Sequence, residues 1–157
     1  MFQFLDQIPA PLAVFLTAMA PITEVRGAVP LAVSVYHLSW PVALFWSILG
    51  NFVGVLIVLF FLDAFYHVFV AHFPFTRPLF DWLFKHTRDK FTVNYQKYGA
   101  VTLILFTAMP LPFFGAYTGA VAAFLLGVPM RKSILYLAIG IILAALLVAL
   151  ITYGFVG

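Results

Sequence analysis

The sequence has no cysteine and very few charged residues. Of its 157 residues, 8% are charged, 65% are hydrophobic and 18% are aromatic. A soluble domain carries roughly 25% charged residues, so this chain cannot cover a water-soluble globule with polar side chains. The absence of cysteine excludes disulfides, thiolate metal sites and thiol nucleophiles. The composition indicates one integral membrane domain, without a large catalytic domain outside the bilayer.

Patterns typical of enzymes, metal sites and nucleic-acid binding are missing as well. The four histidines, His37, His67, His72 and His86, lack the spacing of metal ligands and have no clustered acids beside them. The sequence has no Gly-rich phosphate loop, no nucleophile elbow and no basic surface interleaved with aromatic residues. We therefore expect no metal, no cofactor, no nucleic-acid partner and no enzymatic activity.

Two segments, 41–62 and 133–153, are long and apolar enough to cross a bilayer, because a spanning helix needs about 20 apolar residues. Two other regions, 10–36 and 100–128, each contain two short apolar runs around a Pro- and Gly-rich break. A run of about 10–13 residues reaches only about 15–20 Å, against a bilayer core of about 30 Å. We predict a re-entrant helical hairpin in each region, whose broken backbone must be buried by protein or lined by water.

The two halves of the chain share landmarks at a nearly constant spacing. The matches are Thr17-Ala18-Met19 with Thr107-Ala108-Met109, Gly50 with Gly140, Gly54 with Ala144, and Gly27-Ala28-Val29 with Gly119-Ala120-Val121. They predict an internal repeat, with repeat one over 10–62 and repeat two over 100–153. One helix crosses after the first hairpin and the linker 63–99 does not cross back. The second repeat is therefore inverted, as in many secondary transporters.

Basic residues gather on one side of this arrangement. Within the linker, residues 78–91 are amphipathic, which suits a helix in the headgroup plane. Seven basic residues fall on the linker side and none on the other: Arg77, Lys85, Arg88, Lys90, Lys97, Arg131 and Lys132. By the positive-inside rule we expect a cytoplasmic linker and both termini outside a prokaryotic inner membrane. The N-terminal stretch has no basic n-region, so we expect it to be retained rather than cleaved as a signal peptide.

Glu24 and Arg26 are the only charged residues inside either hydrophobic half, and both lie at the first break. A charge within the membrane costs about 2.5–3.5 kcal/mol on insertion scales. Glu24 is the candidate for binding a proton, and Arg26, which stays charged and offers a bidentate fork, is the candidate contact for an anion. The alternative is a structural ion pair. Their spacing of two residues disfavours a direct pair on a helix but allows one in a turn.

The breaks supply further candidates, because helix N-termini at both tips would aim backbone N–H groups at the middle of the bilayer. The other predicted substrate- or ion-binding residues are Thr23, Asn51, Pro110, Pro112, Tyr117 and Thr118. Asn51 is equally compatible with helix packing. The predicted hairpin and packing residues are Pro21, Gly27, Pro30, Gly50, Gly54, Gly115, Gly119 and Gly140. Small residues at such positions let helices approach closely.

Two motifs resemble those of a known family. Residues 21–30, PITEVRGAVP, are similar to the Pro-x-x-Glu-x-Arg-Gly-Ala-x-Pro signature of the small multi-drug export protein family. Residues 97–99, KYG, followed by 110–120, PLPFFGAYTGA, are similar to its second motif. The resemblance covers nearly the whole chain and implies a membrane transporter.

The resemblance also implies kinship with the DedA superfamily, whose members have two facing re-entrant hairpins. Some of those members are implicated in proton-coupled movement of lipid-linked phosphates and others in lipid scrambling. The second hairpin of this chain lacks the arginines that better-studied DedA members carry there, and only Arg26 remains. This departure speaks against the binding of lipid phosphates.

We expect an all-α membrane protein that transports or flips a small or lipid-like substrate, with an anion as one option. Coupling would be to protons or another ion through Glu24. One alternative is a passive lipid scramblase or channel, which would be indifferent to a proton gradient. Another is a non-transporting assembly or lipid-organising protein, which would work without Glu24. Two spanning helices are too few to shield two hairpins from lipid, so we also expect a homodimer.

The predicted topology can be tested by cysteine labelling. In intact cells, a Lys90→Cys variant should resist a membrane-impermeant thiol reagent and should react after permeabilisation, because we place the linker inside. The native chain, which has no cysteine, is the control. Labelling of the Lys90→Cys protein from outside would contradict the inverted repeat.

Overall fold

The computed structural model describes residues 8–111 and 114–156, with the backbone alone for residues 90–97. The described residues form α-helices and one 3-10 turn, without a β-strand. The elements are α1 (Ala10–Met19), α2 (Glu24–Ser34), α3 (Trp40–His72), η2 (Pro74–Thr76), α4 (Arg77–Ala108), α5 (Ala116–Leu125) and α6 (Met130–Val156). The predicted all-α class is confirmed.

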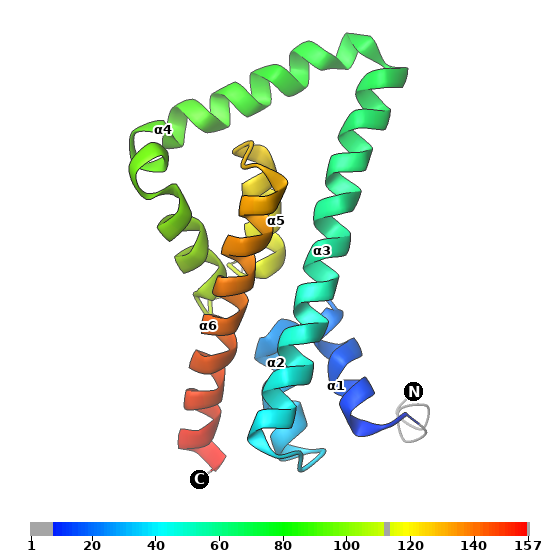
Figure 1. Cartoon of the computed structure of the whole chain (residues 1–157), viewed down its shortest axis with the longest axis vertical. Helices are drawn as coiled ribbons and strands as arrows, with labels where there is room; N and C mark the ends of the chain where they lie inside the picture. The colour runs from blue at the N-terminus through cyan, green and yellow to red at the C-terminus, as the bar shows by residue number, and fades with distance from the viewer. Residues whose placement is uncertain (1–7, 112–113, 157) are drawn as a thin grey trace.

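Two helices, α3 and α6, are long and apolar enough to cross a membrane, and they run in opposite directions (Figure 1). Both predicted spans are therefore present, although each is longer than the sequence suggested. The difference is largest for α3, which continues past residue 62 to His72 and has 33 residues. Its length of about 50 Å exceeds a bilayer core of about 30 Å. Residues 63–72 contain no Pro or Gly, and the helix ends only just before Pro74.

The predicted linker 63–99 is not a separate element. Its residues are shared among the end of α3, the turn η2 and the first part of α4, and α4 continues into the apolar run that ends at Ala108. Between residues 79 and 108 the only helix-weakening residue is Gly99, which alone does not end a helix. Figure 1 shows α4 crossing over the other helices and then bending down beside α6.

Two short helical hairpins pack against the long helices. The first consists of α1 packed on α2, and the second of the end of α4 packed on α5. Their tips meet about halfway along the long helices (Figure 1). The first break is shorter than predicted, because α2 already begins at Glu24 and contains Pro30 within the helix. The re-entrant character of these hairpins depends on the membrane and stays a prediction.

Glycines on α3 and α6 let each hairpin approach its neighbouring long helix. A Cβ at Gly50 would overlap the backbone carbonyl of Phe15 in α1. A Cβ at Gly140 would lie 2.5 Å from the Cβ of Thr107 in α4. Real Cβ atoms do not approach other heavy atoms this closely, so both contacts require glycine.

We expect Gly50→Ala and Gly140→Ala each to destabilise the protein by about 1–3 kcal/mol, because overpacking forces the helices apart. Gly154→Ala is the matched control, since a Cβ there would meet nothing within 4 Å. That variant should be neutral or slightly more stable, because alanine favours a helix. The midpoint of thermal unfolding in detergent measures the difference. Equal midpoints for Gly50→Ala and Gly154→Ala would contradict the packing described here.

Candidate functional site

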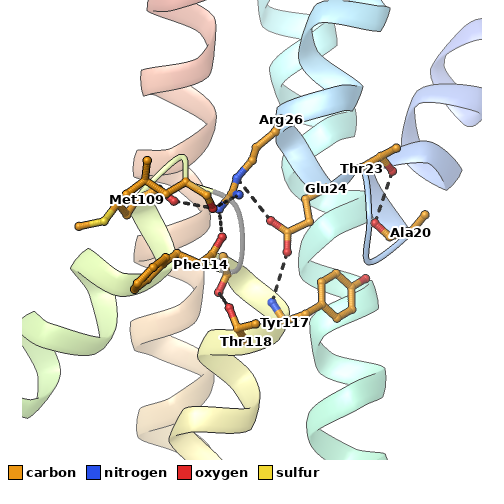
Figure 2. Close-up of polar contacts among 10 residues, drawn as sticks. Ala20, Thr23, Glu24, Arg26, Met109, Phe114, Tyr117 and Thr118 are labelled. Atoms are coloured by element: carbon orange, nitrogen blue, oxygen red, sulfur yellow. Dashed lines mark hydrogen bonds and ion pairs between the residues drawn. The ribbon is translucent and has the colours of Figure 1, made fainter.

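The candidate site lies where the two hairpin tips meet. Glu24 and Arg26, at the start of α2, face the loop after α4 and the start of α5 (Figure 2). The Glu24 residue is 7% exposed. Gly115 makes room for this pair, because a Cβ there would lie 2.6 Å from Oε2 of Glu24 and 2.9 Å from Nη2 of Arg26. Residues far apart in the sequence thus form one buried polar cluster.

The guanidinium group of Arg26 binds the backbone of the second break. Its Nη1 donates to the carbonyl of Leu111 at 2.6 Å, and its Nη2 donates to the carbonyl of Met109 at 2.8 Å and to that of Phe114. These carbonyls follow the end of α4, where a helix leaves acceptors without intrahelical donors. A planar fork of N–H groups suits several acceptors at once. Arg26 therefore holds the second hairpin tip against the first.

The Glu24 carboxylate lies between Arg26 and the N-terminus of α5. Its Oε2 is 3.8 Å from Nε of Arg26, and its Oε1 accepts the backbone N–H of Tyr117 at 3.4 Å. Glu24 has a φ of +49°, a left-handed conformation that costs a non-glycine residue about 1–2 kcal/mol. This backbone conformation at the first residue of α2 explains how two residues only two positions apart can pair.

Tyr117 links the cluster to the first hairpin and to α3. Its hydroxyl donates to the carbonyl of Met19 at the end of α1. Gly54 of α3 leaves the space for this hydroxyl. Next to it, the hydroxyl of Thr118 donates to the carbonyl of Gly115 at 3.1 Å. Tyr117 thus contributes its backbone N–H to Glu24 and its side chain to the helix packing.

The other predicted site residues lie in different places. The Thr23 hydroxyl donates to the carbonyls of Thr17 and Ala20, so it closes the turn between α1 and α2. Asn51 is buried on α3, with no hydrogen-bond partner among the described residues. Pro110 is exposed in the loop after α4. Pro112 lies outside the described residues.

In this conformation Arg26 does not offer a free fork to an anion. Both of its terminal nitrogens already donate to backbone carbonyls. Among the described residues only its Nε–H lacks a hydrogen-bond partner, and Oε2 of Glu24 lies 3.8 Å from that nitrogen. A two-point contact with an anion therefore requires the carbonyl bonds to open or the Glu24 carboxylate to be displaced. Nothing in the sequence marked the carbonyl partners, because backbone groups have no side-chain signature. Within the described residues, no three His, Asp or Glu side chains gather closely enough to hold a metal ion.

A second polar region is a cavity of about 650 Å³ between the far end of α3, the first part of α4 and the turn from α5 to α6. Its apolar lining includes Leu59, Phe84 and Phe124, and its ionisable lining consists of Asp63, His67, Asp81, Lys85, Arg88 and Asp89. These six residues of the predicted linker therefore lie around one cavity, below the part of α4 that Figure 1 shows crossing the molecule.

Comparison with known proteins gives one match. The sequence profile of the small multi-drug export protein family matches residues 24–147. The matched region includes Glu24, Arg26, the loop that Arg26 binds, the whole of α3 and α6 as far as residue 147. No curated protein and no solved structure matches the chain.

Replacement of Arg26 by Met should cost about 3–5 kcal/mol of stability, because it leaves a buried carboxylate unpaired. It also leaves the Phe114 carbonyl without a donor among the described residues and removes one of two donors from the carbonyls of Met109 and Leu111. A Glu24→Gln/Arg26→Met double variant removes both charges but not this second defect, so it should recover only part of the loss. Thermal unfolding and folded yield measure both effects. Arg26→Lys, which keeps the charge without the planar fork, should be intermediate. Full recovery in the double variant would show that Arg26 acts only as an ion-pair partner.

Proposed function

This chain belongs to the small multi-drug export protein family, and we propose that it is an ion-coupled membrane transporter whose substrate passes the hairpin-tip site. The family and the two long apolar helices indicate a membrane export or transport role. The proposal for this site depends on one observation: the buried Glu24 carboxylate lies between Arg26 and the start of α5 (Figure 2). Ionisable groups inside membrane segments are costly and typically mark ion or substrate pathways.

We further propose that the fold consists of two inverted repeats with re-entrant hairpins. Equivalent packing in the two halves supports this: α1 packs on α3 as α4 packs on α6, and α2 packs on α6 as α5 packs on α3. Thr17 and Thr107, which correspond in the repeat, each donate a hydroxyl to the carbonyl four residues earlier. Facing hairpins of this kind also underlie the proposed kinship with the DedA superfamily.

In the proposed cycle, protonation of Glu24 changes how strongly the hairpins hold one another. The ionised carboxylate is attracted by Arg26 and by the N-terminus of α5, where the helix dipole favours negative charge. The neutral carboxyl group loses both attractions, so the tips are held only by the bonds of Arg26 and Tyr117 to backbone carbonyls, and they separate when these bonds open as well. A substrate with a carboxylate or phosphate group could then occupy the position that Glu24 leaves. Alternate opening around such a site is the principle of many inverted-repeat transporters.

The charged cavity favours a second candidate, a passive lipid scramblase. It begins at Leu59 and Asp63, about 30 Å along α3 from Trp40 at 1.5 Å per residue. That distance matches the bilayer core and places the cavity at the level of the lipid headgroups. With the linker in the cytoplasm of a prokaryotic cell, the cavity would open to the inner leaflet. Scrambling through it would need neither a proton gradient nor Glu24, and neither candidate involves an enzymatic step.

We also propose a homodimer, because the first hairpin tip is uncovered. Ile22 at this tip is 96% exposed, and Pro21 beside it is exposed as well. Irregular backbone at membrane depth is tolerated only where it is buried in protein or lines a water-filled cavity. A second copy that covers the turn between α1 and α2 would satisfy this requirement.

Glu24→Gln tests the proposed coupling. The amide keeps the size and the acceptor for Tyr117 but cannot ionise, so the variant should fold and should lose pH-gradient-driven flux. We suggest ethidium and a fluorescent lipid analogue as probes, in liposomes with and without an imposed pH gradient. Asp6→Asn, which neutralises a carboxylate outside both predicted hairpins, is the control and should keep its flux.

Two outcomes would oppose the proposed coupling. A fully active Glu24→Gln protein would exclude Glu24 as the proton carrier. Flux of the lipid analogue through the native protein that is the same with and without the gradient would support the scramblase instead.

A further inference from the structure

Two buried side chains of α3 lack hydrogen-bond partners among the described residues. Ser47 is 0% exposed and Asn51 is 1% exposed. The hydroxyl oxygen of Ser47 and both the oxygen and the nitrogen of the Asn51 amide are unpaired. Buried polar groups in proteins are nearly always bonded to protein or to ordered water. These three atoms therefore indicate a ligand.

Other buried hydroxyl groups in the long helices are hydrogen-bonded. Thr107 donates to the carbonyl of Leu103 at 2.9 Å, and Thr152 donates to the carbonyl of Val148 at 2.7 Å. This bond to the preceding turn is the usual arrangement for a hydroxyl within a helix. Ser47 does not make it, so its unpaired hydroxyl is a particular feature of this position.

The two side chains share one face of α3, because residues four apart lie one above the other on a helix. One turn before them, Ala43 packs in a cluster with residues of α2, and one turn after them, Val55 packs in another cluster that also includes residues of α2. The α2 members of these clusters are Ala28 and Ala32, and Val25 and Val29. Ser47 and Asn51 therefore lie between two apolar clusters on the buried face of α3, which packs on both α1 and α2.

This position continues the hairpin-tip site toward the start of α3. Gly54, which makes room for Tyr117 and Met19 at the tips, comes three residues after Asn51. At 1.5 Å per residue, Asn51 lies about 4–5 Å from the level of Gly54, and Ser47 about 6 Å beyond that. Ser47 and Asn51 thus lie between the tips and the end of the molecule where α3 begins.

The unpaired donors and acceptors of Ser47 and Asn51 indicate which kind of ligand fits between them. A cation would satisfy the oxygens of Ser47 and Asn51 but would leave the amide N–H groups without an acceptor. An anion would leave the amide oxygen without a donor. Water both donates and accepts, so it can satisfy all three atoms.

We propose that Ser47 and Asn51 form a water-binding site on the buried face of α3, through which the proton that Glu24 binds travels from the end of the molecule where α3 begins. The second part rests on the proposed function, whereas the water site does not. A proton from bulk water passes along hydrogen-bonded water molecules and binds the Glu24 carboxylate.

The water site can be tested with a single thiol, because the native chain has no cysteine. In Ser47→Cys, the infrared S–H band should convert to S–D after transfer into D2O about tenfold faster, or more, than in Ala145→Cys. Ala145 is also fully buried, but in the apolar core cluster. Asn51→Cys serves as a second, independent position should Ser47→Cys fold poorly. Exchange as slow as that of Ala145→Cys at both positions would overturn the water site.

The proton route has a separate test. Asn51→Leu, which replaces the amide by an apolar group of similar size, should slow gradient-driven proton flux, followed with a pH-sensitive dye in liposomes, about tenfold. Ile48→Leu is the control and should transport like the native protein. Fast thiol exchange together with normal flux in Asn51→Leu would overturn the route and leave the water site intact. A fully active Glu24→Gln protein would instead overturn the proposed function.

Discussion

The bonds from Arg26 to the carbonyls of the second break are the interaction on which the rest of the site depends. An interrupted helix frees backbone acceptors, and inside a membrane neither lipid nor bulk water can satisfy them. Here the carbonyls of Met109 and Leu111 accept one bond within the loop, and Arg26 of the first hairpin donates a second bond to each and also binds the Phe114 carbonyl. The Glu24 carboxylate then offsets the charge of Arg26. Neither tip is complete without the other.

The two hairpins reach this arrangement by different chemistry, although they occupy equivalent places in the fold. The first break is a short turn that Thr23 closes locally through the carbonyls of Thr17 and Ala20. The second break is a longer loop whose carbonyls also accept hydrogen bonds from Arg26 of the first hairpin. The first hairpin therefore contributes side chains to the site, and the second contributes backbone groups. Movement of one hairpin relative to the other would disturb the bonds of Arg26 to the second break and the bond of Glu24 to the start of α5 together.

Polar groups elsewhere extend this site along the molecule. On one side of the tips, Ser47 and Asn51 are buried on α3 without partners among the described residues. On the other side lies the charged cavity beneath α4. Val55 of α3 lies in one apolar core cluster with residues of α2 and α6, between Asn51 and the charged cavity that begins at Leu59. This alternation of polar and apolar layers fits a protein in which contacts between hairpins control access.

The sequence by itself determined the membrane class, the two long apolar helices, the positions of both breaks and the placement of the charged pair Glu24 and Arg26 at the first break. These features follow from local properties: apolar length, Pro and Gly, and the cost of a charge in hydrocarbon. The sequence did not determine where α3 ends, because residues such as Asp63 and His67 mark a polar region without breaking a helix.

Only the tertiary structure decided the partners of these residues. Arg26 binds backbone carbonyls, Glu24 meets the N-terminus of α5, and Asn51 is left unpaired on a different helix. Backbone acceptors look alike in every sequence, so nothing in the order of residues marks which of them will lack a donor. That outcome depends on how the hairpins meet in space, and hydrogen-bond satisfaction is therefore a property of the whole fold.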